Sequence, residues 1–212
     1  MNQIEALRRL KRLGTQGFET RDAAAALSVT SPNAHMILQR LAGAGLLTHV
    51  SRGRWLLGAD VSPLTLPELI SAPYPAYVSL QSALFHHGLV EQVPAVIYSV
   101  SLGRPRRVRT PLGVVSFHRV PPELFTGFEI EDAGGAKIAS AEKALFDLLY
   151  LSPGRSRLFA SLPELEIPRN FQWSLLKEYC ALVKSPSRRT FLAERIARLR
   201  TGARKYKKEN KR

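Results

Sequence analysis

Six side chains between positions 31 and 40 could contact the edges of nucleic-acid bases. They alternate with Ala34, Leu38 and Leu41, which share one face of a predicted helix, so the six should face solvent. Asparagine and glutamine can form paired hydrogen bonds with adenine, and arginine can do so with guanine. The same residue types are also common on the exposed face of any helix, so a purely structural role stays open. The candidates are Ser31, Asn33, His35, Met36, Gln39 and Arg40.

Two groups of arginines could contact phosphate. Arg52 and Arg54 flank Gly53 at the predicted tip of a hairpin, where guanidinium groups can reach phosphate or the minor groove. A second group falls within residues 104–109, and alternation along a strand would divide its members between two faces. In both places the alternative is a charged, solvated hairpin or edge strand without a partner. The candidates from the second group are Arg104, Arg106 and Arg107.

The motifs of common enzymes are absent from the sequence. It contains no G-x-S-x-G, Walker loop, H-E-x-x-H or strand-linked G-x-G-x-x-G. His86 and His87 are adjacent on a predicted helix, roughly 100° apart, and so are poorly placed to hold one metal ion. Acidic residues between positions 123 and 142 match no metal-binding spacing that would support a nuclease. We therefore expect no catalytic residue, no metal site and no cofactor.

The composition predicts a folded protein that attracts polyanions. Of its 212 residues 45% are hydrophobic, and 31 Lys and Arg against 17 Asp and Glu give a formal charge of +14. Such an excess favours nucleic acid as a partner through counterion release. Residues 151–212 contribute most of it, with 16 basic and 5 acidic residues.

Cysteine content and hydropathy indicate in which cellular compartment the protein is expected. Cys180 is the single cysteine, which excludes an internal disulfide and a zinc ribbon, and we expect it to be a buried, inert thiol. The N-terminus lacks the apolar region of a signal peptide, and no segment approaches the ~20 apolar residues of a membrane span. We therefore expect a cytoplasmic protein with no membrane partner.

Residues 1–60 are predicted to form a winged helix-turn-helix DNA-binding domain. Ile4, Leu7 and Leu10 predict a first helix that stops near Gly14. Two further helices and a hairpin follow, which is the element order of this fold. The predicted elements are two helices and two strands. The helices span 21–27, capped by Thr20, and Pro32 to about Gly43–Gly45, capped by Ser31, and the strands span 46–50 and 55–57.

The rest of the chain predicts a mixed domain, so the expected fold class is α+β, with a winged helix-turn-helix followed by a mixed α/β C-terminal domain. Residues 61–76 are rich in proline and predict a linker with a short helix at 67–70. Residues 77–200 form the predicted C-terminal domain, and residues 201–212 a basic, disordered tail. The C-terminal domain has four predicted helices, over 80–87, capped by Ser79, over 141–151, capped by Ser140, and over 173–183 and 188–200. It also has a predicted strand over 95–101 and a predicted hairpin of 106–109 with 114–120.

Four segments of the predicted C-terminal domain resemble the AbiEi antitoxin family. They are YVSLQSALFHHGL, VIYSVS, TPLGVVSFHRVPPELFTGF and KIASAEKALFDLLYL, and the resemblance extends from Glu5 to about Leu151. It implies a non-enzymatic antitoxin of a type IV toxin–antitoxin system that represses its own promoter and opposes a nucleotidyltransferase toxin without needing a stable complex. The expected DNA partner is an inverted-repeat operator in that promoter.

The resemblance also implies that a basic face of both domains lies along DNA. That face would combine Arg52 and Arg54 with Arg104, Arg106 and Arg107. Two alternatives stay open: a solitary winged-helix regulator without a toxin, and a DNA-targeted nuclease or nucleotidyl-modifying enzyme.

Overall fold

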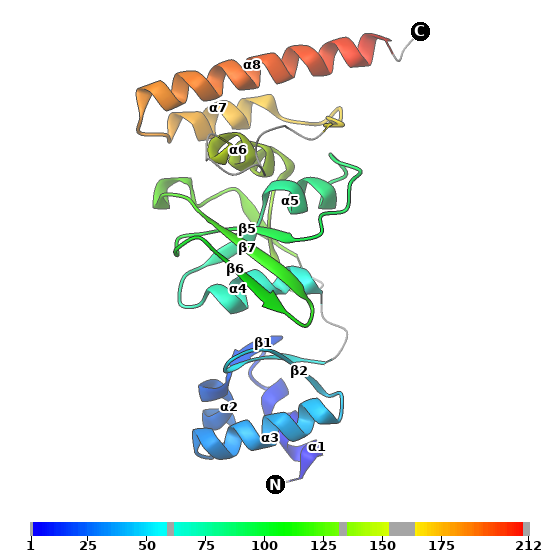
Figure 1. The fold of residues 1–212 in the computed structure, drawn as a ribbon, viewed down its shortest axis with the longest axis vertical. Coiled ribbons are helices and arrows are strands. Elements are labelled where there is room, and N and C mark those ends of the chain that lie inside the picture. Colours follow the sequence, from blue (N-terminus) through cyan, green and yellow to red (C-terminus); the bar gives the residue numbers. More distant parts are fainter. Residues whose placement is uncertain (1, 59–61, 132–134, 153–163, 210–212) are drawn as a thin grey trace.

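The computed structural model describes residues 2–58, 62–131, 135–152 and 164–209, with side chains as far as Gly202. The described residues form eight α-helices and two β-sheets, which confirms the predicted α+β class. Figure 1 shows an elongated molecule, with the N-terminal part (residues 2–58) at one end, a larger sheet in the middle and the last two helices at the other end. We call residues 62–209 the C-terminal part.

The N-terminal part packs three helices against a small sheet. Its elements are α1 (Gln3–Lys11), β1 (Gly17–Glu19), α2 (Thr20–Leu27), α3 (Ser31–Gly43), β2 (Leu47–Ser51) and β3 (Arg54–Leu57). The strands pair antiparallel in the order β1-β3-β2. Leu10, Leu27, Leu38, Leu41 and Trp55 are buried in the core between helices and sheet. The three predicted helices and the predicted hairpin are thus present.

The starts of α2 and α3 differ from the prediction. Thr20 is the first residue of α2, and Glu19 takes the cap position, where it forms a capping box with Asp22. Helix α3 likewise begins at Ser31, with Thr30 before it. The predicted caps were each one residue late. In α2 the capping box satisfies the free amides from a glutamate instead of a hydroxyl, and in α3 the Thr30 side chain makes no cap hydrogen bond.

The core-facing side of α1 also differs from the prediction. Ile4 is 80% exposed, whereas Ala6 and Leu10 are buried. The small side chain of Ala6 lets the helix lie close to its neighbours. Strand β1 is not predicted by the sequence, since its three residues include one buried side chain, Phe18, and show no alternation long enough to detect.

The C-terminal part is built on a six-stranded sheet in the order β6-β7-β5-β4-β9-β8. Neighbouring strands pair antiparallel except β4 with β9 and β5 with β7, which are parallel. The predicted strand and hairpin correspond to β5, β6 and β7. The strands are β4 (Ala76–Val78), β5 (Ile97–Ser101), β6 (Arg106–Thr110), β7 (Gly113–Arg119), β8 (Phe128–Ile130) and β9 (Lys137–Ala139).

Four helices cover this sheet and extend the molecule. They are α5 (Leu80–His86), α6 (Ala141–Leu151), α7 (Trp173–Ala181) and α8 (Pro186–Glu209). Ser140 caps α6 as predicted, by accepting a hydrogen bond from the Lys143 backbone. Helix α8 runs past the predicted boundary at residue 200, so residues 201–209 of the predicted disordered tail are helical and residues 210–212 lie outside the described residues. This stretch has no proline, and its Ala, Arg and Lys residues favour helix.

The predicted linker is structured. Pro63–Thr65 forms a 3₁₀ turn and α4 spans Leu66–Ser71, in agreement with the predicted short helix. An apolar cluster, here called the shared cluster, joins α4 to β3 of the N-terminal part and to β7; it comprises Val50, Leu56, Leu66, Ile70, Ala76, Val115 and Phe117. Because both parts contribute to it, α4 is a packed element and not a free spacer. The division into domains itself stays a prediction.

A polar network is buried in the core of the C-terminal part. Lys143 and Asp147, one turn apart on α6, form an ion pair with both side chains fully buried. The Tyr77 hydroxyl and the Ser79 hydroxyl donate to Asp147 over 2.9 and 2.8 Å. Burial, and then the nearby Asp147 charge, raise the pKa of Tyr77, so its hydroxyl stays protonated and able to donate. Ser79, predicted to cap α5, uses its hydroxyl here instead.

Candidate nucleic-acid interface

Helix α3 presents the face expected from its sequence. Ala34, Leu38 and Leu41 are buried against the rest of the N-terminal part. Among the six candidates five are exposed: Ser31, Asn33, Met36, Gln39 and Arg40. Pro32 occupies the first turn, and the 13-residue helix begins after a turn in which Ser28 adopts φ +56°. The result is a helix with polar and one large apolar side chain directed at solvent.

His35 differs from the other candidates on α3. Its ring is only partly exposed and meets the edge of Trp55, with 5.7 Å between ring centroids. His49 of β2 lies against the same indole at 4.4 Å, and the Trp55 indole N–H donates to the Thr20 hydroxyl over 2.9 Å. His35 therefore packs onto the β-hairpin and fixes α3 relative to it, which makes it less available for contact with a base.

The two arginines of the β2–β3 hairpin have different surroundings. Arg52 is exposed in the turn, beside Gly53 at φ +73°. Arg54 turns inward, and its side chain is only 23% exposed. Its guanidinium donates a hydrogen bond to the Ala72 carbonyl over 3.1 Å and lies 3.7 Å from a Glu19 carboxylate oxygen. The Arg54 charge is thus engaged at the end of α4, and its role as a phosphate contact stays a prediction.

Pairing of β6 with β7 divides the second arginine group between two faces, as alternation predicts. Arg106 lies opposite Phe117, on the face that packs against α4, and Arg107 lies opposite Ser116 on the other face. The Arg106 guanidinium donates to the Ile70 carbonyl over 2.8 Å and lies 5.3 Å from the centre of the Phe117 ring. Like Arg54, Arg106 thus binds the carboxyl end of α4, where cations are favoured.

The other arginines near β6 are exposed, as Arg106 itself still is. Arg104 lies in the bend before the strand, and Arg107 and Arg109 project from its outer face. β6 is an edge strand of the sheet, so nothing in the described residues pairs beyond it. Burial lowers the pKa of His118, on the same face of β7, so at neutral pH this imidazole adds little charge. The arginines are therefore the source of positive charge on this face.

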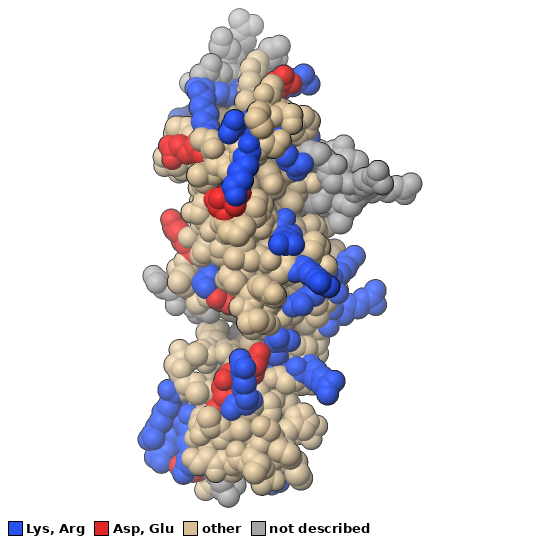
Figure 2. Space-filling model, turned by 90° about the vertical axis from the view of Figure 1, so that its left-hand side faces the viewer, with Lys and Arg blue, Asp and Glu red and all other residues tan. Residues whose placement is uncertain are grey.

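Several basic side chains lie together on the face of the C-terminal part that Figure 2 presents. Figure 2 shows them gathered at the level of the six-stranded sheet, with few acidic side chains among them. Sequence reasoning identified the arginine groups but not the double contact of Arg54 and Arg106 with α4, for which the sequence carries no signal. The structure brings these two candidates to carbonyls two residues apart, Ile70 and Ala72.

The described residues lack two other kinds of feature. They contain no group of three or more His, Cys, Asp or Glu placed to hold a metal ion. None of the helices described is both long enough and apolar enough to cross a membrane. In comparisons with known proteins, no family model and no curated protein matches this chain.

Proposed function

We propose that this protein is a DNA-binding transcriptional regulator whose N-terminal part acts as a winged helix-turn-helix. The observation that carries the proposal is the exposed polar face of α3, held between two other helices and a β-hairpin. In this fold the corresponding helix enters the major groove. The net charge of +14 supports a polyanionic partner.

The side chains have different roles in this proposal. Asn33, Gln39 and Arg40 read base edges, and Ser31 at the start of the helix contacts phosphate. Met36, 54% exposed, offers an apolar contact such as a thymine methyl group. Phosphate contacts are assigned to Arg52, Arg104 and Arg107, whereas Arg54 and Arg106 hold α4 and position the two parts. His35 is assigned to the packing of α3.

The antitoxin role is a further part of the proposal and rests on the resemblance to the AbiEi family. In that role the protein represses its own promoter and opposes a nucleotidyltransferase toxin without catalysis of its own. A neighbouring reading frame with nucleotidyltransferase motifs would distinguish it from a solitary regulator. Metal-dependent turnover of DNA, RNA or nucleotides would instead indicate the enzyme alternative.

The test of DNA binding uses the full-length protein and its own promoter. We expect it to bind an inverted repeat there more tightly than a scrambled duplex of equal length. The logarithm of the affinity should fall linearly with the logarithm of salt concentration, with a slope of about 0.9 per phosphate neutralised. Fluorescence anisotropy across a salt series measures both quantities. Equal affinity for both duplexes, or an affinity insensitive to salt, would refute the proposal.

Two classes of variant should separate positioning from base reading. Arg52→Ala should weaken all duplexes alike and reduce the salt slope by about one phosphate contact. Asn33→Ala and Gln39→Ala should each lower discrimination between operator and scrambled duplex by about 1–3 kcal/mol where the side chain pairs with a base. Arg198→Ala, on exposed α8 at the far end of the molecule, is the matched control (Figure 1). If the two classes behave alike, the assigned orientation of α3 is wrong.

A further inference from the structure

The two edge strands of the six-stranded sheet carry opposite charges with the same spacing. Strand β6 contributes Arg107–Arg109, with the sequence Arg-Val-Arg, and β8 leads into Glu129–Glu131, with the sequence Glu-Ile-Glu. We call these triplets the basic edge and the acidic edge. Side chains alternate along a strand, so in each triplet the charged residues share one sheet face, about 6.6 Å apart, and the aliphatic residue points to the other.

Both edges are open in the part of the chain that the structure describes. β6 and β8 are the terminal strands, so one side of each has backbone N–H and C=O groups without a neighbouring strand. Arg107, Arg109 and Glu129 are exposed. Ile130 is 62% exposed, and a large aliphatic side chain on an open edge strand favours pairing with another chain.

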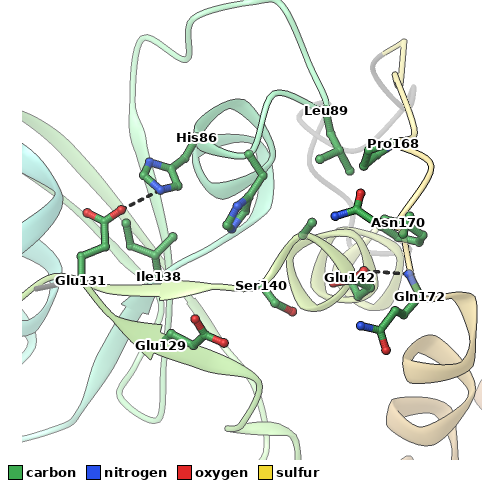
Figure 3. Close-up of a pocket in the computed structure, with 13 residues that line it drawn as sticks. His86, Leu89, Glu129, Glu131, Ile138, Ser140, Glu142, Pro168, Asn170 and Gln172 are labelled. Atoms are coloured by element: carbon green, nitrogen blue, oxygen red, sulfur yellow. Dashed lines mark hydrogen bonds and ion pairs between the residues drawn. The ribbon is translucent and has the colours of Figure 1, made fainter.

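The acidic edge lies beside the hollow drawn in Figure 3. Glu129 and Glu131 both line this hollow, which agrees with their common sheet face. Glu131 forms an ion pair with His86 over 2.7 Å, and 41% of its side chain remains exposed. The Glu129 carboxylate has no hydrogen bond or ion pair with any described residue. Both carboxylates are therefore accessible to a cationic partner.

The charges decide which edges of two copies can meet. Pairing of β6 with β6 would place arginines opposite arginines, and pairing of β8 with β8 would place glutamates opposite glutamates. Like charges directly opposite each other destabilise a sheet, whereas opposite charges stabilise it. Each edge thus repels its own counterpart in a second copy, and only the basic edge with the acidic edge is favoured.

The strand registers decide how the second copy is oriented. Register partners across the sheet place Arg107 on the same face as Tyr77 and Phe128, and therefore place Glu129 on the opposite face. A second copy brings its glutamates to the face of Arg107 only when it is turned over about an axis that runs across the strands. Within one copy β6 and β8 run in opposite directions, so the β8 of the turned copy runs parallel to β6.

We propose that the acidic edge of one copy of this chain pairs with the basic edge of a second copy, as parallel strands that continue the sheet. The contact is heterologous, so it does not close between two copies, and each outer edge stays free for a further copy. One strand pair is a small interface, so the association is weak and appears at high protein concentration. The neighbours across the pair are Arg107 with Glu129, Val108 with Ile130, and Arg109 with Glu131.

Sedimentation velocity of the full-length protein over a concentration series tests the charge pairing. We expect the sedimentation coefficient of the unaltered protein to rise with concentration. Two variants with a reversed edge, Arg107→Glu/Arg109→Glu and Glu129→Lys/Glu131→Lys, should each keep the value of the monomer. An equimolar mixture of these variants should regain the rise, because each reversed edge then meets an edge of opposite charge.

A matched control separates the edge pairing from the overall charge. The variant with the reversed basic edge has a net charge of +10 instead of +14, which weakens repulsion between copies and by itself would favour association. Lys177→Glu/Arg198→Glu, at exposed positions of α7 and α8, has the same net charge of +10 and should still associate. Only pairing at the edges predicts a difference between these two proteins.

Disulfide trapping tests which strands meet. A mixture of the Val108→Cys protein with the Ile130→Cys protein should give a linked dimer when diamide is added as oxidant. Neither protein alone should do so, because β6 does not pair with β6 or β8 with β8. The unaltered chain is the control, since its one cysteine, Cys180, is buried.

The inference is wrong if the unaltered protein shows no dependence on concentration, or if the reversed basic edge associates as the control does. It is equally wrong if the mixture of reversed variants stays monomeric, or if one cysteine variant alone is linked as readily as the mixture. Should circular dichroism show that Glu129→Lys/Glu131→Lys is misfolded, Glu129→Lys replaces it, because Glu131 then keeps His86. All measurements are made without nucleic acid, so failure here leaves the proposed DNA binding standing, and failure of promoter binding leaves this interface standing.

Discussion

Asp147→Ala is expected to lower the free energy of unfolding by about 3–5 kcal/mol, since it leaves the Lys143 ammonium buried without its partner. Tyr77 and Ser79 would also lose the acceptor of their hydroxyl groups. The aromatic rings around Lys143, at 5.2 to 5.7 Å from its Nζ, can offset only part of this cost. Urea denaturation followed by circular dichroism measures the change.

A double replacement separates the charge from the packing. Lys143→Met combined with Asp147→Leu removes both buried charges and keeps similar side-chain volumes. We expect this protein to be more stable than the Asp147→Ala protein, although two hydroxyls remain without an acceptor. If the double variant is the less stable of the two, the loss in Asp147→Ala does not come from an unpaired charge.

Ile70→Ala is expected to lower the free energy of unfolding by about 2–5 kcal/mol, the usual cost of a cavity in a packed core. Ile70 is 2% exposed and lies in the shared cluster between the N-terminal and C-terminal parts. The loss should be accompanied by faster proteolysis within residues 62–75, since the cluster holds α4 to both parts. Denaturation and limited proteolysis of the same sample test the two effects.

The matched control removes the same atoms from an exposed position. Ile130 is 62% exposed on the edge strand β8, so Ile130→Ala should change stability by less than about 0.5 kcal/mol. Comparable losses at the two positions would contradict the packing described for the shared cluster. A stable Ile70→Ala protein with intact proteolytic resistance would show that the two parts are held together by other contacts.

The helices of the N-terminal part could be predicted because most of their apolar residues recur with helical spacing, although their starts were predicted one residue late. Pro32 and the exposed residues of α3 are read directly from such a pattern. Short strands gave no comparable signal: β4, β8 and β9 each have three residues, and Ala76–Val78 is buried throughout. Their pairing is decided by segments distant in the sequence, which a local pattern cannot contain.

Candidate residues were predicted by type, but their partners were not. Arg52 and Arg54 look equivalent around Gly53, yet only Arg54 faces a helix end. Arg106 and Arg107 are neighbours, and strand alternation directs one to α4 and the other to solvent. The carbonyls that distinguish them come from residues 70 and 72, within a segment whose composition indicates a linker. The contact with the end of α4 therefore distinguishes Arg54 and Arg106 from Arg52 and Arg107.

The contact of His35 with Trp55 makes the environment of an indole depend on α3. Replacing Trp173 by Phe would leave Trp55 as the sole tryptophan, because the chain has two. Indole fluorescence is sensitive to an adjacent imidazole, and here the ring centroids of two imidazoles lie within 5.7 Å of that of Trp55. The protein thus carries an intrinsic optical probe beneath the helix assigned to base reading, and a displacement of α3 changes its emission without any attached dye.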